Sequence, residues 1–415
     1  IKFKSFETKI KKFDLEQNQY AIGDILFDGL KFKLKQNLMQ EIAKKAEEKV
    51  EPSSEQKPLQ LELNGIQLKN FDIDYGDDNS GIFAQLKWTN FETKIKKIDL
   101  QNNHYAVDDI DLDGLFVKLK QKNKQQQKTN EPEVDVIQKE SPLKIELNKI
   151  NLTNLNVDYG DEISKTFAQI NLKQFETKIN ELGLDKNKFD IDYINLKDAK
   201  INANLHLVNQ QSTSNTNTNS QPFNLILNKV TTENIQIKYT NTAIKRAPQG
   251  MDFNHLNFTK LNLDLRDFKM IHNEIEGSIK SASIQEGKGL NIQQFRTDFL
   301  YGETQTYLKN FYLKTPKTLL KNQVVLSYAN QNQLTNHPEK ITISADLNQS
   351  KIGFSDILYL VPDLKNTVPF NHYPTAVLNV DAAVRGKMND ILIQRLNVSG
   401  LDDLNVSANG RIKNA

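Results

Sequence analysis

The first candidates for chemistry in this 415-residue chain are carboxylates spaced two residues apart. Asp109, Asp111 and Asp113 precede Gly114 and match the first half of a calcium-binding loop. Such a loop needs an acidic ligand at its twelfth position, which is Lys120 here. The pattern is therefore incomplete as a metal site.

An earlier stretch of the chain keeps the same glycine but lacks one of the carboxylates. Asp24, Asp28 and Gly29 stand at the equivalent positions, and Leu26 replaces the middle carboxylate. Asp-Gly pairs between alternating apolar residues are typical of β-hairpins. We therefore expect a hairpin turn at both places.

A second acidic cluster consists of Asp72, Asp74, Asp77 and Asp78. Its first two members alternate with Phe71, Ile73 and Tyr75. Successive residues of a strand point to opposite faces of a sheet. We expect Asp72 and Asp74 to form the solvated face of a strand.

Histidines and known catalytic motifs give no further candidate. The six histidines are scattered without the spacing of metal ligands; they are His104, His206, His255, His272, His337 and His372. No nucleophile elbow, phosphate-binding loop or dinucleotide fingerprint is present, and Gly287-Lys288-Gly289 is long enough only for a turn. We expect no enzymatic activity, no cofactor and no metal.

Composition narrows the class of protein further. The chain has 54 basic and 52 acidic residues, a net charge of +2, which does not favour a nucleic-acid partner. It has no cysteine, so a disulfide framework and a thiolate metal site are excluded. The hydrophobic share of 38% fits sheets that are apolar on one face only, joined by polar linkers.

The organising feature of the sequence is a repeat. The pentapeptide Phe-Glu-Thr-Lys-Ile occurs three times, starting at residues 6, 91 and 175, which gives steps of 85 and 84 residues. A fixed period is the signature of a repeat architecture. In the second copy we expect Phe91, Thr93 and Ile95 on the apolar face of a strand, with Glu92 and Lys94 on the solvated face.

The period divides the chain into segments. We expect a partial first repeat at 1–36, a second at 59–121, a third at 143–206, a degenerate fourth at 223–335 and a further β segment at 336–415, with linkers at 37–58, 122–142 and 207–222. The linkers are polar, and their composition is typical of flexible tethers. Within the first linker, Met39–Val50 could form a short helix.

Within each copy the alternation of apolar residues shifts by one position at fixed places. In the second copy it shifts at Asn64-Gly65 and again at Asn70. A shift of one residue reverses the face that points inward, so each must be a bulge or a turn. Gly76-Asp77 in the second copy and Gly160-Asp161 in the third are predicted turns.

One late segment is predicted to be helical. Ser355 could cap a short helix at about 355–361, which Pro362 would end. Its apolar residues could lie across the sheet or simply pack against it.

The predicted fold class is all-β: an elongated repeat array of antiparallel strands, with few short helices. The strands could form a closed sandwich or an open sheet curled into a U-shaped groove with an apolar interior. The long repeats and the lack of covering amphipathic helices favour the groove. The predicted lining residues are Leu59, Leu61, Leu63, Phe71, Ile73, Tyr75, Leu86, Trp88, Phe91, Ile95, Leu143, Ile145, Leu147, Leu155, Val157, Tyr159, Ile170, Leu172, Phe175, Ile179, Phe223, Leu225, Leu227, Ile235, Ile237 and Tyr239.

Such a groove would suit acyl chains. At ~4.8 Å per strand, roughly 20 strands would extend on the order of 100 Å, several times the ~30 Å core of a bilayer. An exposed apolar strip of that extent would promote aggregation unless something occupied it. Each buried methylene group of a lipid contributes about 0.8 kcal/mol without directional bonds.

The repeated motif resembles a known family. Units of the form Leu/Ile-x-Leu-Asn-x-Ile-x-Leu-x-Asn-x-x-Ile/Val-x-Tyr-Gly-Asp, at 61–77 and 145–161, are similar to those of the AsmA-like and TamB envelope proteins of Gram-negative bacteria. The segments at 352–357 and 386–391 resemble the version found in Bacteroidota.

The resemblance implies a periplasmic body with a β-groove, anchored in the inner membrane by a segment that would precede Ile1. It further implies phospholipid transport between the inner and outer membranes. For TamB it implies outer-membrane protein assembly beside a barrel partner. The family's C-terminal domain is not in this stretch.

Two functions therefore follow as expectations. The first is a periplasmic lipid conduit that carries phospholipid acyl chains between the membranes. The alternative is an assembly or scaffold module for outer-membrane β-barrel proteins, acting by strand addition with a barrel partner.

Overall fold

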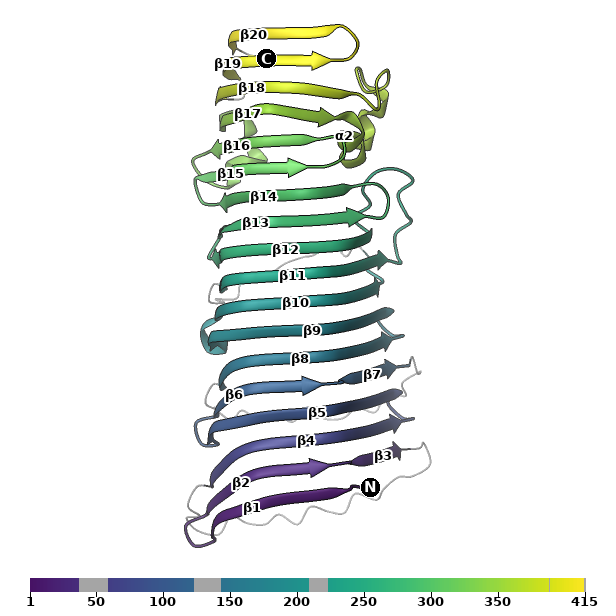
Figure 1. The fold of residues 1–415 in the computed structure, drawn as a ribbon, viewed down its shortest axis with the longest axis vertical. Helices are drawn as coiled ribbons and strands as arrows, with labels where there is room; N and C mark the ends of the chain where they lie inside the picture. Colours follow the sequence, from purple (N-terminus) through teal and green to yellow (C-terminus); the bar gives the residue numbers. More distant parts are fainter. Residues whose placement is uncertain (37–58, 123–142, 209–222, 388, 414–415) are drawn as a thin grey trace. The chain divides into compact units, whose positions relative to one another are not determined.

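The computed structural model describes residues 1–36, 59–122, 143–208, 223–387 and 389–413. Within these ranges the twenty strands belong to a single mixed sheet, and the two α-helices are short (Figure 1). The prediction of an all-β repeat fold with few short helices is confirmed. Two compact units divide the chain, namely Ile1–Phe189 with Ala199–Leu207, and Asp190–Asp198 with Val208–Ala415.

The first unit holds the clearest repeats. Its strands are β1 (Ser5–Asp14), β2 (Gln19–Asp28), β3 (Lys31–Gln36), β4 (Gln60–Asp77), β5 (Ile82–Asp99), β6 (His104–Asp113), β7 (Phe116–Gln121), β8 (Lys144–Asp161) and β9 (Thr166–Gly183), followed by the 3-10 turn η1 (Leu184–Lys186). The next strand, β10 (Lys188–Leu205), contributes residues to both units.

The second unit continues with hairpin-connected strands. They are β11 (Asn224–Asn241), β12 (His255–Ile271), β13 (Glu274–Glu286), β14 (Asn291–Tyr301), β15 (Gln305–Lys314), β16 (Leu319–Ser327), β17 (Thr342–Gly353), β18 (Val377–Lys387), β19 (Asp390–Gly400) and β20 (Leu404–Lys413). From β11 to β20 each strand pairs antiparallel with the next.

The expectation of antiparallel strands throughout needs one correction. β2 and β3 pair parallel to β4, and β6 and β7 pair parallel to β8. In the second unit, β10 and β11 also run parallel, because their contacts Asn195–Thr231 and Asp198–Asn234 share an offset of 36 residues.

The parallel pairs follow from the repeat. Each repeat holds three strands, if β6 and β7 count as one. With an odd number of antiparallel strands, the chain leaves a repeat at the opposite end of the strands from the end at which it entered. A parallel neighbour then requires a crossover connection. The linkers predicted at 37–58, 122–142 and 207–222 occupy these three crossovers in the sequence. They lie almost wholly outside the described residues, as does the predicted helix at 39–50.

The two Asp-Gly pairs are not hairpin turns, contrary to the prediction. Gly29 separates β2 from β3 and Gly114 separates β6 from β7, yet both segments of each pair lie along the same neighbouring strand. Both glycines have positive φ, +77° and +68°. They bend a continuing strand, and a side chain at Gly114 would collide with Thr89.

The predicted shifts at Asn70 and at its counterpart Asn154 are real backbone features. Both residues adopt the left-handed conformation in mid-strand, with φ of 52° and 54°. Each side-chain amide donates to a carboxylate on the neighbouring strand, Asn70 to Asp28 and Asn154 to Asp113, over 2.8 Å. In the second unit Asn234 (φ 56°) repeats this with Asp198, at 2.7 Å.

The predicted turns lie one or two residues further along than expected. β4 and β8 extend through Asp77 and Asp161, and the turns follow. Each carboxylate then organises its turn: Asp77 accepts from the Ser80 hydroxyl, and Asp161 accepts from the Ser164 hydroxyl, both over 2.6 Å.

The predicted late helix is present as α2 (Phe354–Leu360), followed by the 3-10 turn η3 (Pro362–Asn366). Ser355 does not cap it, because Gly353 is the N-cap residue and no side chain bonds there. Two further short elements were not predicted, namely α1 (Asn332–Asn336) and the 3-10 turn η2 (Pro338–Lys340).

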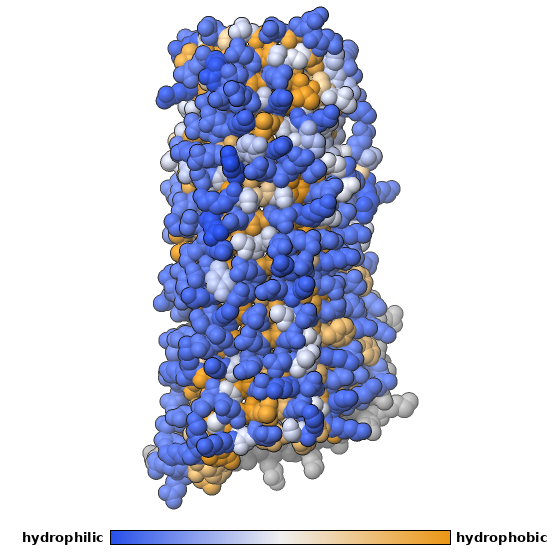
Figure 2. Space-filling model, viewed as in Figure 1, coloured by the Kyte–Doolittle hydropathy of each residue, from blue (hydrophilic) through white to orange (hydrophobic). Residues whose placement is uncertain are grey.

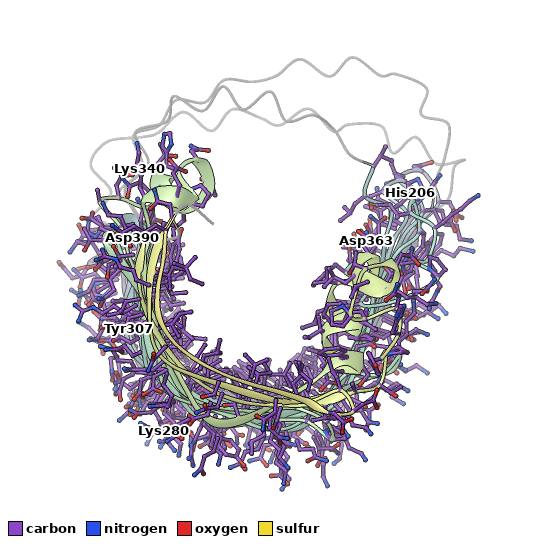
Figure 3. The ribbon with its side chains drawn as sticks, turned by 90° about the horizontal axis from the view of Figure 1, so that it is seen from above. His206, Lys280, Tyr307, Lys340, Asp363 and Asp390 are labelled. Atoms are coloured by element: carbon purple, nitrogen blue, oxygen red, sulfur yellow. The ribbon has the colours of Figure 1, made fainter. Side chains whose placement is uncertain are left out.

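The strands of the second unit bend around an open space (Figure 3). Lys280 of β13 and Tyr307 of β15 lie on the outer side of the bend. The helical segments that contain Lys340 and Asp363 lie on opposite sides of the opening. From β13 onward the strands are shorter than the 18-residue strands of the repeats, and α2 and η3 extend one wall of this unit.

Candidate functional site

The candidate site in the first unit is the apolar face of the sheet. Along β4 and β5, apolar residues pair directly across the ladder: Leu68 with Phe91, Phe71 with Trp88, and Ile73 with Leu86. The third repeat pairs equivalent positions of β8 and β9, such as Leu152 with Phe175 and Val157 with Ile170. The shift at Asn70, and its counterpart at Asn154, therefore keeps the apolar pairs before and after it on one face, which we call the apolar face.

Aromatic rings connect four strands on this face. The centroid of Phe27 lies 5.6 Å from that of Phe6 and 5.4 Å from that of Phe71, both edge-on. Phe71 stacks on Trp88 at 4.6 Å, and the indole N–H of Trp88 donates to the Leu68 carbonyl over 3.1 Å. The indole nitrogen of Trp88, the only polar atom among these four rings, thereby has its hydrogen bond within the sheet.

The repeated pentapeptide has a structural role. Phe91 and Ile95 are half-buried, whereas Glu92 and Lys94 are exposed. Thr93 is buried, and its hydroxyl donates to the Asp109 carbonyl over 2.7 Å. Because the register with β6 shifts just after Thr93, this hydroxyl satisfies a carbonyl at the irregularity.

The second unit has an apolar face of its own. Val230 pairs with Leu265, Ile235 with Leu261, and Ile237 with Phe258. Further strands add pairs that the sequence did not assign to the lining, such as Phe295 with Leu313 and Ala382 with Leu396. The repeat period fades there, and the alternation along each strand was the only available signal.

The predicted lining residues lie on the expected strands. They belong to β4 (Leu61, Leu63, Phe71, Ile73, Tyr75), β5 (Leu86, Trp88, Phe91, Ile95), β8 (Ile145, Leu147, Leu155, Val157, Tyr159), β9 (Ile170, Leu172, Phe175, Ile179) and β11 (Leu225, Leu227, Ile235, Ile237, Tyr239). Leu59, Leu143 and Phe223 each stand one residue before their strand and are exposed.

Burial shows how this face differs from a protein core. In the described parts of the chain only eleven hydrophobic residues are buried. Most residues of the apolar face are half-buried, covered by their neighbours in the sheet but not from above. A second layer would bury them, as in a sandwich. Among the described residues, each unit is therefore a sheet with an open apolar face.

The opposite face is polar. Figure 2 shows a surface with mostly hydrophilic side chains. The predicted solvated carboxylates lie there in ion pairs: Asp72 with Lys87 at 3.1 Å and Asp74 with Lys33 at 3.3 Å. Exposed pairs of this kind contribute little to stability, but they keep the face wet.

The aspartates of the half calcium loop are used in the sheet. Asp109 accepts from Asn148 over 2.9 Å and Asp111 from Asn151 over 3.0 Å, both across the parallel pair β6–β8. Within the described residues no cluster of three or more histidine or acidic side chains could hold a metal ion.

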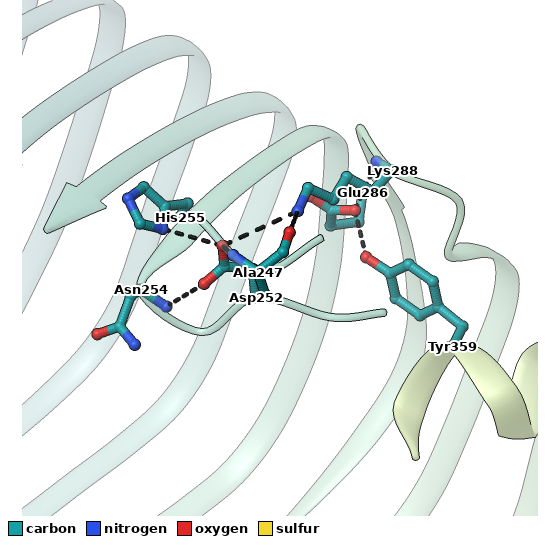
Figure 4. A network of polar contacts seen from close by, with 7 residues as sticks. All are labelled: Ala247, Asp252, Asn254, His255, Glu286, Lys288 and Tyr359. Atoms are coloured by element: carbon teal, nitrogen blue, oxygen red, sulfur yellow. Dashed lines mark hydrogen bonds and ion pairs between the residues drawn. The ribbon is translucent and has the colours of Figure 1, made fainter. Parts of the chain in front are cut away.

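A buried polar cluster in the second unit joins the β11–β12 connection to α2 (Figure 4). The Nδ1 atom of His255 lies 2.9 Å from Asp252, and both side chains are 4% exposed. Asp252 also accepts from the backbone N–H of Ala247 (2.8 Å) and of Asn254 (3.1 Å). Tyr359 of α2 donates to the buried Glu286 of β13.

Electrostatics in this cluster serve to hold structure together. Burial raises the pKa of Asp252, but the N–H groups of Ala247 and Asn254 and the neighbouring His255 outweigh it, so the net pKa lies below the usual value. Burial and the bond to Glu286 strongly raise the pKa of Tyr359, which stays a donor at neutral pH. Neither group is arranged beside a nucleophile, so we assign the cluster to anchoring α2.

Comparisons with known proteins do not identify the chain. No family model and no solved structure matches it. It is 26% identical over 178 residues to the redox-sensing transcriptional repressor Rex of Exiguobacterium sibiricum, a match that covers 37% of this chain and 81% of the repressor. At that identity no family relationship is shown.

Within the described ranges the longest helix, α2, has seven residues.

None of the helices in the described ranges has the length and apolar character that a membrane crossing requires.

Proposed function

We propose that this chain is a lipid conduit whose apolar face carries phospholipid acyl chains. The observation that carries the proposal is the open apolar face, continuous from strand to strand within each unit and only half-buried. A surface of this kind normally marks a binding site.

Acyl chains suit this face better than a polar ligand does. The cross-strand pairs offer mainly apolar groups, and the Thr93 hydroxyl and the Trp88 indole N–H among them are satisfied within the sheet. Each methylene removed from water contributes about 0.8 kcal/mol in any orientation. A lipid can therefore move along the face without breaking directional bonds.

The cellular setting is part of the proposal. The motifs at 61–77 and 145–161 resemble those of AsmA-like and TamB proteins. By this resemblance the conduit belongs to the periplasm of a Gram-negative bacterium. An inner-membrane anchor would lie outside this stretch, and the phospholipid would pass to the outer membrane. No enzymatic step is proposed.

The test is to place charge on the apolar face. Leu63, Leu147 and Leu227 are half-buried on β4, β8 and β11. Changing all three to Asp should abolish lipid transfer between donor and acceptor vesicles, because an acyl chain would have to pass three carboxylates.

The matched control puts the same three charges on the exposed residues Gln60, Lys144 and Asn228 of the same strands. This variant should transfer lipid at the wild-type rate. Unchanged transfer by a correctly folded Leu→Asp triple variant would refute the conduit.

The alternative function is a scaffold for outer-membrane barrel proteins that acts by adding a strand to an edge of the sheet. β20, whose ten side chains are all exposed, pairs with β19 in the described part of the chain and would offer such an edge. Lipid extraction and mass spectrometry of the purified protein separate the two functions. A lipid-free protein favours the scaffold.

A further inference from the structure

At one end of its strands, the second unit has a rim that is built by three connecting segments distant in sequence. The backbone N–H of Met251, in the β11–β12 connection, donates to the Tyr359 carbonyl over 2.8 Å. The side chain of Lys365 reaches Gln249 at 3.4 Å. From the β15–β16 turn, the hydroxyls of Thr315 and Thr318 both donate to Asp356 at 2.6 Å. We call residues 242–254, 315–318 and 354–371 the basic edge.

Large apolar side chains of the basic edge stand in solvent. Phe253 is 67% exposed, Leu360 53%, Val361 46% and Val368 76%. Two of them belong to the α2–η3 region, which extends the wall of this unit. The apolar character of the sheet therefore continues onto its edge.

Cations accompany these apolar groups. Lys245, Arg246, Lys317 and Lys365 are all exposed. The carboxylates of the same segments are mostly turned inward, since Asp252 bonds to His255 and Asp356 bonds to two threonines. Of the acidic residues in these described segments, Asp363 is the exposed one. The edge thus presents four cations against one solvated carboxylate.

We infer that the basic edge binds the anionic head group of a lipid whose acyl chains lie against the apolar face. The inference rests on the proposed conduit and adds the substrate class. Lysine and arginine side chains bind phosphate through charge-assisted hydrogen bonds. Apolar side chains beside them are the arrangement that anionic amphiphiles recognise. The buried Asp252 and Tyr359 bonds hold the cations in place.

The test compares two lipids that differ in head-group charge. Delipidated protein is titrated with short-chain phosphatidylglycerol and short-chain phosphatidylcholine, both kept monomeric. The wild type should bind phosphatidylglycerol about tenfold more tightly. Inorganic phosphate should weaken phosphatidylglycerol binding more than phosphatidylcholine binding, because the choline cation of the latter offsets the charge of its phosphate.

Charge reversal then locates the site. Lys245→Glu with Arg246→Glu should remove the preference by weakening phosphatidylglycerol binding more than phosphatidylcholine binding. The control, Lys238→Glu with Lys280→Glu, reverses two exposed charges on strands of the same unit and should keep the preference. Lys317→Gln with Lys365→Gln is a milder second variant that should reduce the preference.

The outcomes separate this inference from the proposed function. Equal binding of the two lipids by the wild type, or a preference that survives charge reversal, overturns the basic edge while leaving the conduit intact. Failure of both lipids to bind overturns the conduit and the head-group site together.

Discussion

At Asp252, burial and hydrogen bonding oppose each other and hydrogen bonding prevails. Burial raises the pKa of the carboxyl group, but the two backbone N–H donors and His255 lower the pKa by more than burial raises it. The carboxyl group therefore stays ionised although it is almost inaccessible to water. Lys288 lies 3.8 Å from the same carboxylate and donates to the Ala247 carbonyl over 2.8 Å. A single buried charge thus organises the β11–β12 connection.

This arrangement predicts a defined response to acid. Because the folded pKa of Asp252 lies below its usual value of 3.8, the unfolded chain takes up the proton first as pH falls. The stabilisation is fully present above that value and is lost as pH drops through the folded pKa. We expect the protection factors of the Ala247 and Asn254 amides, corrected for the intrinsic pH dependence of exchange, to be high at neutral pH and to fall once the pH drops below 3.8 towards the folded pKa.

Asp252→Ala should give fast exchange at both amides across the whole range, while amides in the middle of β13 keep their protection. Slow exchange at Ala247 in that variant would show that the carboxylate does not hold the connection.

The Tyr359 hydroxyl offers a second residue-scale test. Tyr359→Phe removes one hydrogen-bond donor from the buried Glu286. The Lys288 backbone N–H, at 2.6 Å, remains as a donor to this carboxylate. The loss of a hydrogen bond to a buried charge costs ~1–3 kcal/mol of unfolding free energy. Tyr373→Phe is the control, because Tyr373 bonds to Asp402 at an exposed site and its loss should cost no more than about 0.5 kcal/mol. Equal effects in urea denaturation would contradict the anchoring role.

At the scale of elements, β4, β8 and β11 each carry a left-handed asparagine in mid-strand, namely Asn70, Asn154 and Asn234. Asn154 combines φ of 54° with the bond to Asp113, which also receives the Thr153 hydroxyl and has a lowered pKa because of these two donors. Asparagine tolerates this conformation better than most residues because its short side chain bonds locally.

Two substitutions at Asn154 separate conformation from hydrogen bonding. Asn154→Gly keeps the backbone conformation and loses only the side-chain bond, at a cost of ~0.5–1.5 kcal/mol. Asn154→Val also forces a β-branched residue into the left-handed region and should cost ~1–2 kcal/mol more. Urea denaturation of the two variants measures the difference, and equal stabilities would mean that the bend tolerates any side chain.

The elements also show what the sequence could reveal. The alternation of apolar residues located the strands and their inward faces, because burial on one side leaves a direct trace in the residue types. The parallel pairs were missed because pairing direction depends on a distant neighbour: Gly29 and Gly114 satisfy the local rules of a hairpin, but β4 and β8 hold both flanking segments in line. The cluster around Asp252 was missed because Glu286 and Tyr359, which complete it, lie far along the chain from Asp252 and His255.

At the scale of the whole molecule, the apolar face poses a problem of stability. A sheet with no second layer over its apolar face leaves most of its hydrophobic side chains in partial contact with water, and few side chains of the described residues reach full burial. Ladder hydrogen bonds and cross-strand pairs within the sheet offset this. A ligand that binds the folded sheet and not the unfolded chain should add the stability that a second layer would supply.

The conduit therefore predicts that lipid stabilises the protein. Delipidated protein should unfold at a lower temperature than lipid-loaded protein and bind a hydrophobic dye more strongly. Short-chain phospholipid should restore the melting temperature with increasing concentration, and at one hundred times Kd the gain should be about 2.7 kcal/mol. The Leu63, Leu147 and Leu227 to Asp variant should gain less, because its face accepts acyl chains poorly. A melting temperature that does not change with lipid concentration would mean that the apolar face binds some other partner. Strand addition would then be the function to test.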